Sequence, residues 1–399
     1  MSGIATNHAR DLLALSTAPG LGPQRVRRLL ERFGSPAEVF GRSESELATV
    51  LGIGPALARR ARQSFDTAHR KADEELAQLE KLGGRAVAVG DENYPALLAP
   101  LPDAPPVLFV RGDLDAALGR YPVAIVGSRD HTHYGHEQAG RFASALATAG
   151  LMVVSGGARG IDAAAHRAAM AAGGKTVVVL GTGLGVPYPP EHAGLFDEIA
   201  DSGRGAIVSE LPAQTPPIAQ NFPSRNRIIS GLSLGVLVIE AGRKSGALIT
   251  ARIAAEDHGR EVMAVPGRID SPHSAGCNDL LRAGGAGLVS DPADVIEQLE
   301  QSARFAHDET HAARYRAEPA RTEPARTAPT PPLRPLAAVP LPETEPERSI
   351  MQALAEPKTP DQLAETLGLE IAALRTSITT LDLAGLIRRE GTRIARRSG

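Results

Sequence analysis

The sequence predicts a doubly wound α/β fold, in which a mostly parallel β-sheet is covered by helices on both faces. Two observations predict it. Short runs rich in Val, Ile and Ala are apolar throughout instead of alternating with polar residues, and amphipathic helical stretches separate most of them. This combination is typical of parallel strands buried on both faces. The runs are 86–89, 107–110, 122–127, 151–157, 176–181, 206–210, 236–241 and 261–267.

Glycines follow several of these predicted strands, at Gly127, Gly156, Gly157, Gly181 and Gly267. Sheets of this kind bind their ligands outside the carboxyl ends of the strands. We therefore expect the functional site along this edge of an α/β domain that occupies residues 71–301.

Residues 1–70 predict a helical domain with an internal repeat. PGLGPQRVRRLLERFG (19–34) and LGIGPALARRAR (51–62) both place Gly, an apolar residue, Gly and Pro before a helical stretch. The pattern resembles a pair of helix-hairpin-helix units in a bundle similar to a sterile alpha motif. Such turns present backbone N–H groups to a nucleic-acid phosphate. Three arginines lie close to the first turn, Arg25, Arg27 and Arg28. A tight turn within a docking bundle is the alternative.

A proline-rich segment at 302–346 separates this body from a small C-terminal domain. Nine prolines fall between Pro319 and Pro346. Such a segment buries too little apolar surface to fold, and its prolines make it a stiff spacer.

Residues 347–399 predict a winged helix, with three helices followed by a short hairpin. Thr359 or Asp361 is expected to cap the second helix, and Gly368 to close it. Five arginines in the last 12 residues suit contact with phosphates. Because many winged helices bind protein instead, duplex and protein contact both remain open.

The composition limits the classes of function. No apolar run reaches the roughly 18 residues that a membrane span needs, and the N-terminal stretch lacks the basic start of a signal peptide, which predicts a cytoplasmic protein. A single cysteine, Cys277, excludes an intramolecular disulfide and a thiolate metal cluster. The net charge of −3 means that any affinity for nucleic acid must come from local clusters of cations, and 3% aromatic residues leave little for base stacking.

Three enzyme-like motifs fail because of their context. GLSLG (231–235) resembles a nucleophile elbow, but a helical stretch precedes Ser233 and a strand follows it, which is the reverse order. GGKT (173–176) lacks the first glycine of a P-loop and leads into a strand. GTGLG (181–185) is followed by prolines that prevent the helix of a dinucleotide site. We expect no catalytic residue, metal or cofactor.

SGGARGIDAAAH (155–166) is better placed for binding, since it joins a predicted strand to a helix. Its glycines permit a backbone nest for an oxyanion or a phosphodiester, with Arg159 in reach. Asp162 and His166 lie one helical turn apart, which suits an acid–base or metal pair. An intrahelical hydrogen bond is the favoured alternative, because no third metal ligand is in sight.

Cations follow four of the predicted strands. Besides Arg159, these are Arg129 beside Ser128, Arg225 and Arg227, and Arg243 and Lys244 with Ser245 and Thr250 nearby. Each alone is compatible with a solvated surface charge. Together on one edge of the sheet, these cations fit a long polyanion better than a small nucleotide. A single strand of nucleic acid, bound by its backbone, fits best, because the domain offers no protruding helix that could enter the major groove of a duplex.

Several motifs then resemble one family. VAIVGSR…YG, SGGARGIDAAAH, VLGTGLGVPYP, SELP, FPSRNRIISGLS, VIEA…SGALITA and VPG…S.GCN.L occur in this order over residues 75–290. They look like the DNA-processing protein A family, DprA, also called Smf. The resemblance implies a Rossmann-like homodimer that binds single-stranded DNA, shields it from nucleases, and helps to load the RecA recombinase during natural transformation and recombination.

The resemblance also implies the binding residues. Arg129, Lys175, Arg225, Asn226 and Arg227 would line the DNA groove together with the 155–160 loop. The complete expected set of DNA contacts is Ser128, Arg129, Ser155, Gly156, Gly157, Arg159, Gly160, Lys175, Arg225, Asn226, Arg227 and Lys244.

One enzyme remains as the alternative, a nucleoside monophosphate phosphoribohydrolase. A related Rossmann-like group of this activity resembles a PGGxGTxxE pattern whose glutamate serves catalysis. Here Glu210 and Glu240 are the nearest candidates, and neither has that context. We therefore expect a non-catalytic binding protein.

Overall fold

The computed structural model describes residues 6–117, 121–300 and a C-terminal set of residues. That set is 345–354, 356, 358–369, 374, 377, 378, 381, 386–390 and 393–396. The chain divides into two compact units, Met1–Pro319 and Ala320–Gly399. Among the described helices, none combines the length and the apolar composition that a membrane crossing requires.

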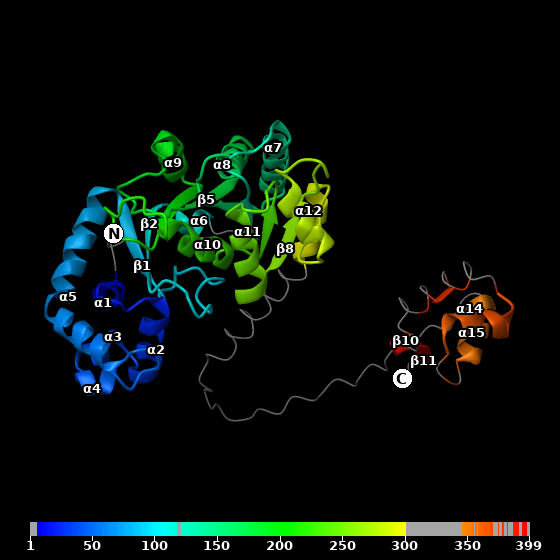
Figure 1. The fold of residues 1–399 in the computed structure, drawn as a ribbon, viewed down its shortest axis with the longest axis horizontal. Helices are drawn as coiled ribbons and strands as arrows, with labels where there is room; N and C mark the ends of the chain where they lie inside the picture. Colours follow the sequence, from blue (N-terminus) through cyan, green and yellow to red (C-terminus); the bar gives the residue numbers. More distant parts are fainter. Residues whose placement is uncertain are drawn as a thin grey trace, which may run out of the picture. The chain divides into compact units, whose positions relative to one another are not determined.

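The first unit begins with a helical bundle (Figure 1). Its helices are α1 (Asn7–Ser16), α2 (Pro23–Phe33), α3 (Pro36–Phe40), α4 (Glu44–Leu47) and α5 (Pro55–Lys81). Both Gly-X-Gly-Pro turns precede helices as predicted, because the proline φ angle suits a first helical position. The predicted boundary at residue 70 is wrong, since α5 continues across it as one helix of 27 residues.

A nine-stranded sheet follows, in the order β1-β2-β6-β5-β4-β3-β7-β8-β9. The strands are β1 (Gly84–Ala88), β2 (Val107–Gly112), β3 (Pro122–Val126), β4 (Met152–Ser155), β5 (Lys175–Val179), β6 (Gly205–Ser209), β7 (Gly235–Val238), β8 (Glu261–Ala264) and β9 (Gly287–Leu288). The pairs β1–β2 and β2–β6 are antiparallel, and the others are parallel. The chain proceeds from β3 through β4 and β5 to β6, and then crosses to β7 on the other side of β3. The switch point between β3 and β7 is the usual ligand position in such sheets.

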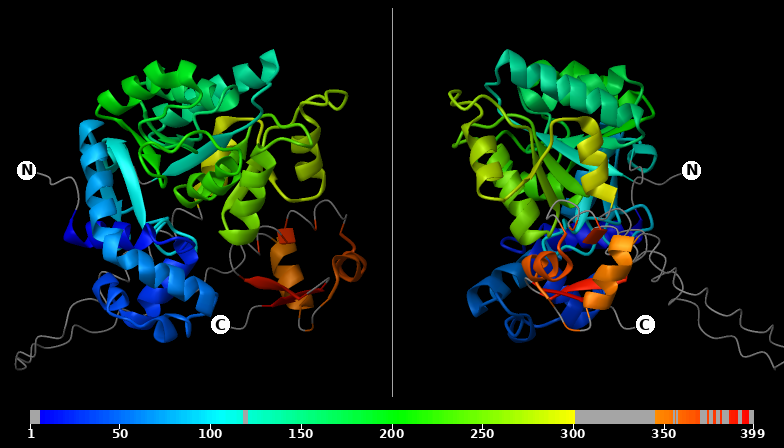
Figure 2. Two further views of the ribbon diagram at one scale, coloured as in Figure 1. Left: turned by 60° about the vertical axis from the view of Figure 1, so that its left-hand side comes forward. Right: turned by 90° about the vertical axis from the view of Figure 1, so that its right-hand side faces the viewer.

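Helices cover both faces of the parallel part of the sheet (Figures 1 and 2). One face carries α7 (His133–Thr148), α8 (Ile161–Ala171), α9 (Ala193–Asp201) and a helix over 292–300, and the other carries α10 (Asn221–Gly231), α11 (Ala247–Arg252) and α12 (Ala275–Arg282). Short elements complete this unit: α6 (Leu114–Ala117), η1 (Pro190–His192) and a π-helical turn, η2 (Ile253–Asp257). In β3, Val123 and Ile125 pack toward the first face, and Ala124 and Val126 toward the second. Burial on both faces explains why the strands are apolar throughout.

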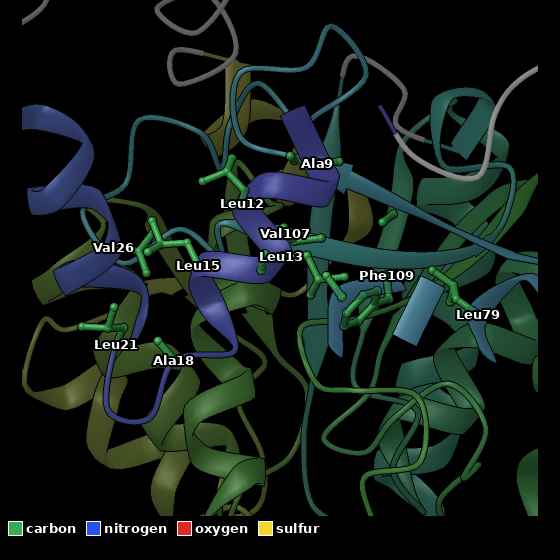
Figure 3. Packing of buried hydrophobic residues seen from close by; sticks show 14 of the residues in the cluster. Ala9, Leu12, Leu13, Leu15, Ala18, Leu21, Val26, Leu79, Val107 and Phe109 are labelled. Atoms are coloured by element: carbon green, nitrogen blue, oxygen red, sulfur yellow. The ribbon is translucent and has the colours of Figure 1, made fainter. Parts of the chain in front are cut away.

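The helical bundle packs directly on the antiparallel end of the sheet. Leu12 and Leu15 of α1 and Leu79 of α5 share a core with Phe109 of β2 (Figure 3). Arg27 of α2 donates a hydrogen bond of 2.6 Å to the Leu101 carbonyl oxygen. Arg27 therefore helps to attach the bundle to the α/β domain.

The second unit has its own small core, which includes Ile350, Leu363 and Ile394. It contains α14 (Glu345–Ala353), α15 (Pro360–Leu367) and an antiparallel hairpin of β10 (Ile387–Glu390) and β11 (Arg393–Arg396).

The predicted caps of α15 are confirmed. Thr359 forms a capping box with Gln362, and Gly368 closes the helix with a φ of 63°. Most of the predicted third helix, and the predicted linker apart from its last two residues, lie outside the described residues.

Candidate nucleic-acid interface

A cavity of about 660 Å³ opens at the carboxyl edge of the sheet, at the switch point between β3 and β7. Its walls come from the segments that follow the strands. They include residues 126–130 after β3, Ala158 and Asp162 after β4, and residues 245–247 after β7, together with Tyr188 and the first turns of α10. The position agrees with the one predicted from the strand-end glycines.

Arg129, Phe222 and Tyr188 form a cationic and aromatic wall of this cavity. The Arg129 guanidinium lies 5.4 Å from the centre of the Phe222 ring, and the Tyr188 and Phe222 ring centres are also 5.4 Å apart. Arg129 is exposed and has no ion pair among the described residues. It is therefore available to a phosphate, as predicted. Ser128 and Asn226 line the same cavity.

Arg225 faces the interior, although it was predicted to contact DNA. Its side chain donates hydrogen bonds to the carbonyl oxygens of Gly156, at 2.6 Å, and of Val179. Only 5% of the residue is exposed. Burial lowers the pKa of its guanidinium to about 10, and the Asp162 carboxylate opposes that effect, so the group stays charged at neutral pH. Arg225 ties the loop after β4 and the last residue of β5 to α10, and the prediction that it contacts DNA is wrong because its guanidinium is buried and bonded to the backbone.

The backbone nest predicted at 155–160 is filled by the chain's own carboxylate. One oxygen of Asp162 accepts hydrogen bonds from the N–H groups of Gly156, at 3.1 Å, and Ala158, at 3.3 Å. Burial raises the pKa of Asp162, and Arg225 and these N–H groups counteract it. An external oxyanion has no place at these two donors, so this part of the predicted site is wrong.

The other residues of the 155–160 loop have structural roles. Ser155 is buried and donates to the Ile125 carbonyl oxygen. The Gly157 carbonyl oxygen lies 2.9 Å from Nδ1 of His192. A Cβ on Gly160 would lie 2.3 Å from the Ser128 carbonyl oxygen, so this glycine lets two loops of the pocket approach each other.

Arg227 and Arg159 are held by carboxylates. Arg227 lies two residues after Arg225 on α10 and therefore points to a different side of the helix. There it pairs with Glu210 and donates to the Asp103 carbonyl oxygen, and only 13% of its side chain is exposed. Arg159 pairs with Glu191 at 2.5 Å. The prediction that Arg227 contacts DNA is wrong, because its mostly buried guanidinium is paired with Glu210. Arg159 stays about half exposed and borders the pocket beside Arg129 and Tyr188, so its contact with DNA stays a prediction. Arg243 likewise pairs with Asp279.

Lys175 lies at the wrong edge of the sheet for the predicted groove. It is the first residue of β5 and pairs in register with Met152, the first residue of β4. The cavity lies at the opposite, carboxyl edge. Lys244 follows β7, is exposed, and has no ion pair in the described parts of the chain, but it does not line the cavity, and its contact with DNA stays a prediction.

His166 does not pair with Asp162, so the favoured intrahelical hydrogen bond is absent. Its Nδ1 lies 2.7 Å from the Thr176 hydroxyl, which itself donates to the Val153 carbonyl oxygen. The Thr176 oxygen must then accept from Nδ1–H. Burial lowers the pKa of His166 to about 3, so the ring is neutral. No three His, Cys, Asp or Glu side chains in the described residues are placed to hold a metal ion.

A Ser-His-Asp arrangement lies in the core and not in the cavity. Ser230 Oγ is 2.9 Å from His258 Nδ1, and His258 Nε2 is 3.4 Å from Asp103. Ser230 is fully buried and does not line the cavity. A nucleophile needs access to its substrate, so this arrangement links α10, η2 and the loop before β2 structurally.

The model of the family described as "DNA recombination-mediator protein A" matches residues 85–300, more than half of the 399 residues. The chain belongs to the DprA/Smf family. Two further models match its flanking parts, a "SAM-like Helix-hairpin-helix tandem" at 12–84 and a "DprA winged helix domain" at 324–391.

Individual DprA/Smf proteins agree with this assignment. Protein Smf of Escherichia coli is 38% identical over 346 residues, which covers 86% of this chain and 86% of that protein. DNA processing protein DprA of Streptococcus pneumoniae is 44% identical over 211 residues, 53% of this chain and 72% of that protein. The X-ray structure of DprA from S. pneumoniae superposes with a TM-score of 0.62 and 36% identity, covering 72% of this chain and 97% of that one.

Sequence reasoning missed two site residues of this DprA/Smf protein, Tyr188 and Phe222. The low aromatic content argued against stacking, but two of the few aromatic residues line the cavity. For Phe222, the feature of the sequence that could have indicated a site residue was its position directly before the proline and arginines of the motif FPSRNR.

Proposed function

We propose that this DprA/Smf protein binds single-stranded DNA in the switch-point cavity and delivers it to the RecA recombinase, without catalysing a reaction itself. One observation carries the proposal. Arg129, which has no ion pair among the described residues, lies beside the tilted ring pair of Phe222 and Tyr188 in a cavity of about 660 Å³. A guanidinium and an aromatic face are the two groups that a nucleotide uses, one for the phosphate and one for the base.

The shape of the site favours a single strand. Base faces are accessible to aromatic rings only where the bases are unstacked. A duplex reader would instead need a helix or ribbon that enters the major groove. The cavity is concave and lies between the segments after β3 and β7, which favours an unpaired strand over a duplex.

The remaining parts of the proposal rest on the family. We propose that the bound strand is protected from nucleases and that RecA takes it over in the cytoplasm, during natural transformation and recombination. We also propose a homodimer, because two sites that act together multiply a weak single-site affinity. The C-terminal winged helix contributes either duplex or protein contact.

The test is a titration of a fluorescent dT oligonucleotide, followed by anisotropy at fixed salt. Arg129→Glu is expected to weaken binding at least tenfold. Lys175→Glu makes the same change in charge at the opposite edge of the sheet and is the matched control, expected to bind like the wild type. Equal affinity of Arg129→Glu and wild type for the oligonucleotide would contradict binding in the cavity. A loss in Lys175→Glu as large as in Arg129→Glu would place the strand elsewhere.

The phosphoribohydrolase alternative is disfavoured by the positions of its candidate carboxylates. Glu210 is paired with Arg227, and Glu240 accepts hydrogen bonds from the backbone N–H and the hydroxyl of Thr132. Neither lines the cavity. Incubation of the protein with AMP or GMP is expected to release no free base, and release that depends on Asp162 would favour the enzyme.

A further inference from the structure

The two aromatic rings of the cavity wall come from two different loops. Tyr188 belongs to the loop after β5, residues 180–189. Phe222 stands in the first turn of α10, directly after the loop that follows β6, residues 210–220. We call these two segments the paired loops. The wall exists only where both loops are held in the correct position, since each of them supplies one ring.

The backbones of the paired loops are hydrogen-bonded to each other. The N–H of Gly185 donates to the Ala213 carbonyl oxygen at 2.8 Å, and that of Gly183 donates to the Thr215 carbonyl oxygen at 3.0 Å. A Cβ on Gly183 or Gly185 would lie only 2.3 or 2.9 Å from the Ala213 carbonyl oxygen. The glycines of the motif GTGLG (181–185) are therefore explained by the close approach of two backbones.

Helix α5 of the helical bundle holds the paired loops from outside. The buried N–H group of Ala213 donates to Oε1 of Glu75 at 2.5 Å. Glu75 is partly buried on α5 and has no ion pair within the described ranges, so its carboxylate is not explained by a neighbouring cation. A hydrogen bond to an ionised acceptor is stronger than a neutral one. In the other loop, Leu184 shares a hydrophobic core with Leu79 of α5. The bundle therefore contacts both loops.

The chain between these contacts and the two rings is short and stiff. Two prolines stand between Ala213 and Phe222, and one stands between Gly185 and Tyr188. Each proline fixes its own φ angle and restricts the residue before it. A displacement at Ala213 is therefore transmitted to the wall instead of being absorbed by the loop, and the hydrogen bond from Gly185 carries it to both rings.

We propose that Glu75 is a positioning residue for single-strand binding, which holds the paired loops so that the rings of Tyr188 and Phe222 are in place before DNA binds. The inference rests on the proposed function of the cavity. A wall that is already ordered binds more tightly, because less conformational entropy is lost on binding. The helical bundle then contributes to binding in the cavity through Ala213, without a contact of its own to the strand.

Glu75→Ala is the decisive variant, because its effects on charge and on position have opposite signs. Removal of a carboxylate by itself favours the binding of a polyanion. Loss of the acceptor for Ala213 disorders the wall, so the affinity of the full-length chain for a fluorescent dT oligonucleotide is expected to fall about fivefold or more, the contribution of one stacked base. Glu75→Gln keeps an acceptor oxygen and is expected to bind within about twofold of the wild type. Glu74→Ala removes the neighbouring, exposed carboxylate and is the matched control, expected to bind at least as tightly as the wild type.

A spectroscopic signature separates positioning from a general loss of stability. The chain contains no tryptophan, so Phe222→Trp places a single reporter in the wall. In this background and without DNA, Glu75→Ala is expected to shift the tryptophan emission to the red and to increase its quenching by acrylamide, whereas Glu74→Ala leaves both unchanged. If Glu75→Ala melts below the assay temperature, Glu75→Met replaces it, because Met keeps the length of the side chain and is a good helix former.

Arg129→Glu is measured in the same series to separate this inference from the proposed function. Weaker binding by Glu75→Ala, rescued in Glu75→Gln and with an unchanged slope of log K against log salt, supports positioning, because no phosphate contact is lost. If Arg129→Glu loses affinity while Glu75→Ala binds like Glu74→Ala, the cavity binds DNA but the role of Glu75 is overturned. If Arg129→Glu binds like the wild type, the proposed function of the cavity fails, and the role of Glu75 fails with it.

Discussion

The guanidinium of Arg225 donates a hydrogen bond of 2.6 Å to the carbonyl oxygen of Gly156, and through it α10 holds the loop that follows β4. Arg225 belongs to the motif FPSRNR, which was predicted to contact DNA, yet its side chain is part of the internal framework of the pocket. The division between framework and contact residues leads to the following predictions.

Replacement of Arg225 is expected to destabilise the fold. Arg225→Ala leaves the buried carbonyl oxygens of Gly156 and Val179 without donors, which costs roughly 2 to 4 kcal/mol in the free energy of unfolding. Arg129→Ala, at an exposed position, changes it by less than about 0.5 kcal/mol. Urea denaturation of both variants checks this, and equal stabilities would show that the buried hydrogen bonds are not formed.

Removal of the Phe222 ring is expected to weaken binding of single strands without unfolding the protein. Stacking of one base on an aromatic ring contributes about 1 to 3 kcal/mol, so Phe222→Leu reduces affinity for a dT oligonucleotide roughly five-fold or more. Phe222→Tyr keeps the ring and serves as control. If Leu and Tyr bind alike, the ring packs against Tyr188 and Arg129 only for structural reasons.

The salt dependence of single-strand binding is expected to report the phosphate contact of Arg129. Each lost contact makes the slope of log K against log salt less negative by about 0.7 for a single strand. Arg129→Gln should show this change relative to the wild type, and Arg227→Gln should not, because Arg227 is already paired with Glu210. Equal slopes of log K against log salt for the wild type and Arg129→Gln would mean that Arg129 does not contact the DNA backbone.

His166 is expected to make stability sensitive to acid. Its pKa is about 3 in the folded chain, against an ordinary value of 6.5. As the pH falls below 6.5, the unfolded chain takes up a proton that the folded chain does not, so the free energy of unfolding falls by up to about 1.4 kcal/mol per pH unit until about pH 3.

His166→Gln removes this contribution. Chemical denaturation between pH 7 and pH 4 should therefore give a flatter dependence of the free energy of unfolding for the variant. The slope is the readout, because the variant also changes stability at neutral pH through its contact with Thr176. Identical slopes would show that His166 is protonated in the folded chain.

The fold was largely predictable because its signals are local. Apolar runs without alternation, helical stretches between them and strand-end glycines together indicated the parallel sheet and its functional edge. The antiparallel pairing of β1 with β2 and of β2 with β6 was not predicted, because it depends on long-range contacts. The predicted domain boundary at residue 70 was wrong, because α5 continues past the sequence repeat from which the boundary was drawn.

The site was predicted less well, because the sequence gives the position of a charge along the chain but not its partner. Arg129 and Arg159 look alike in the sequence, yet only Arg159 meets a carboxylate, that of Glu191, 32 residues away. Arg225 and Arg227 stand in one motif, but the helical turn between them sends one into the core and the other toward Glu210. Partners this far apart in the chain are set by tertiary packing.

The occupation of the loop after β4 by Asp162 has a kinetic consequence. The deepest anion-binding position of the pocket is permanently taken, so a phosphodiester can rest only on the outer cations, where water and salt compete for it. On the proposed function, each such attachment would dissociate quickly, and a strand would be retained by rebinding along its length. If RecA takes over the strand as proposed, it would displace this protein stepwise at vacated stretches, without breaking one strong bond.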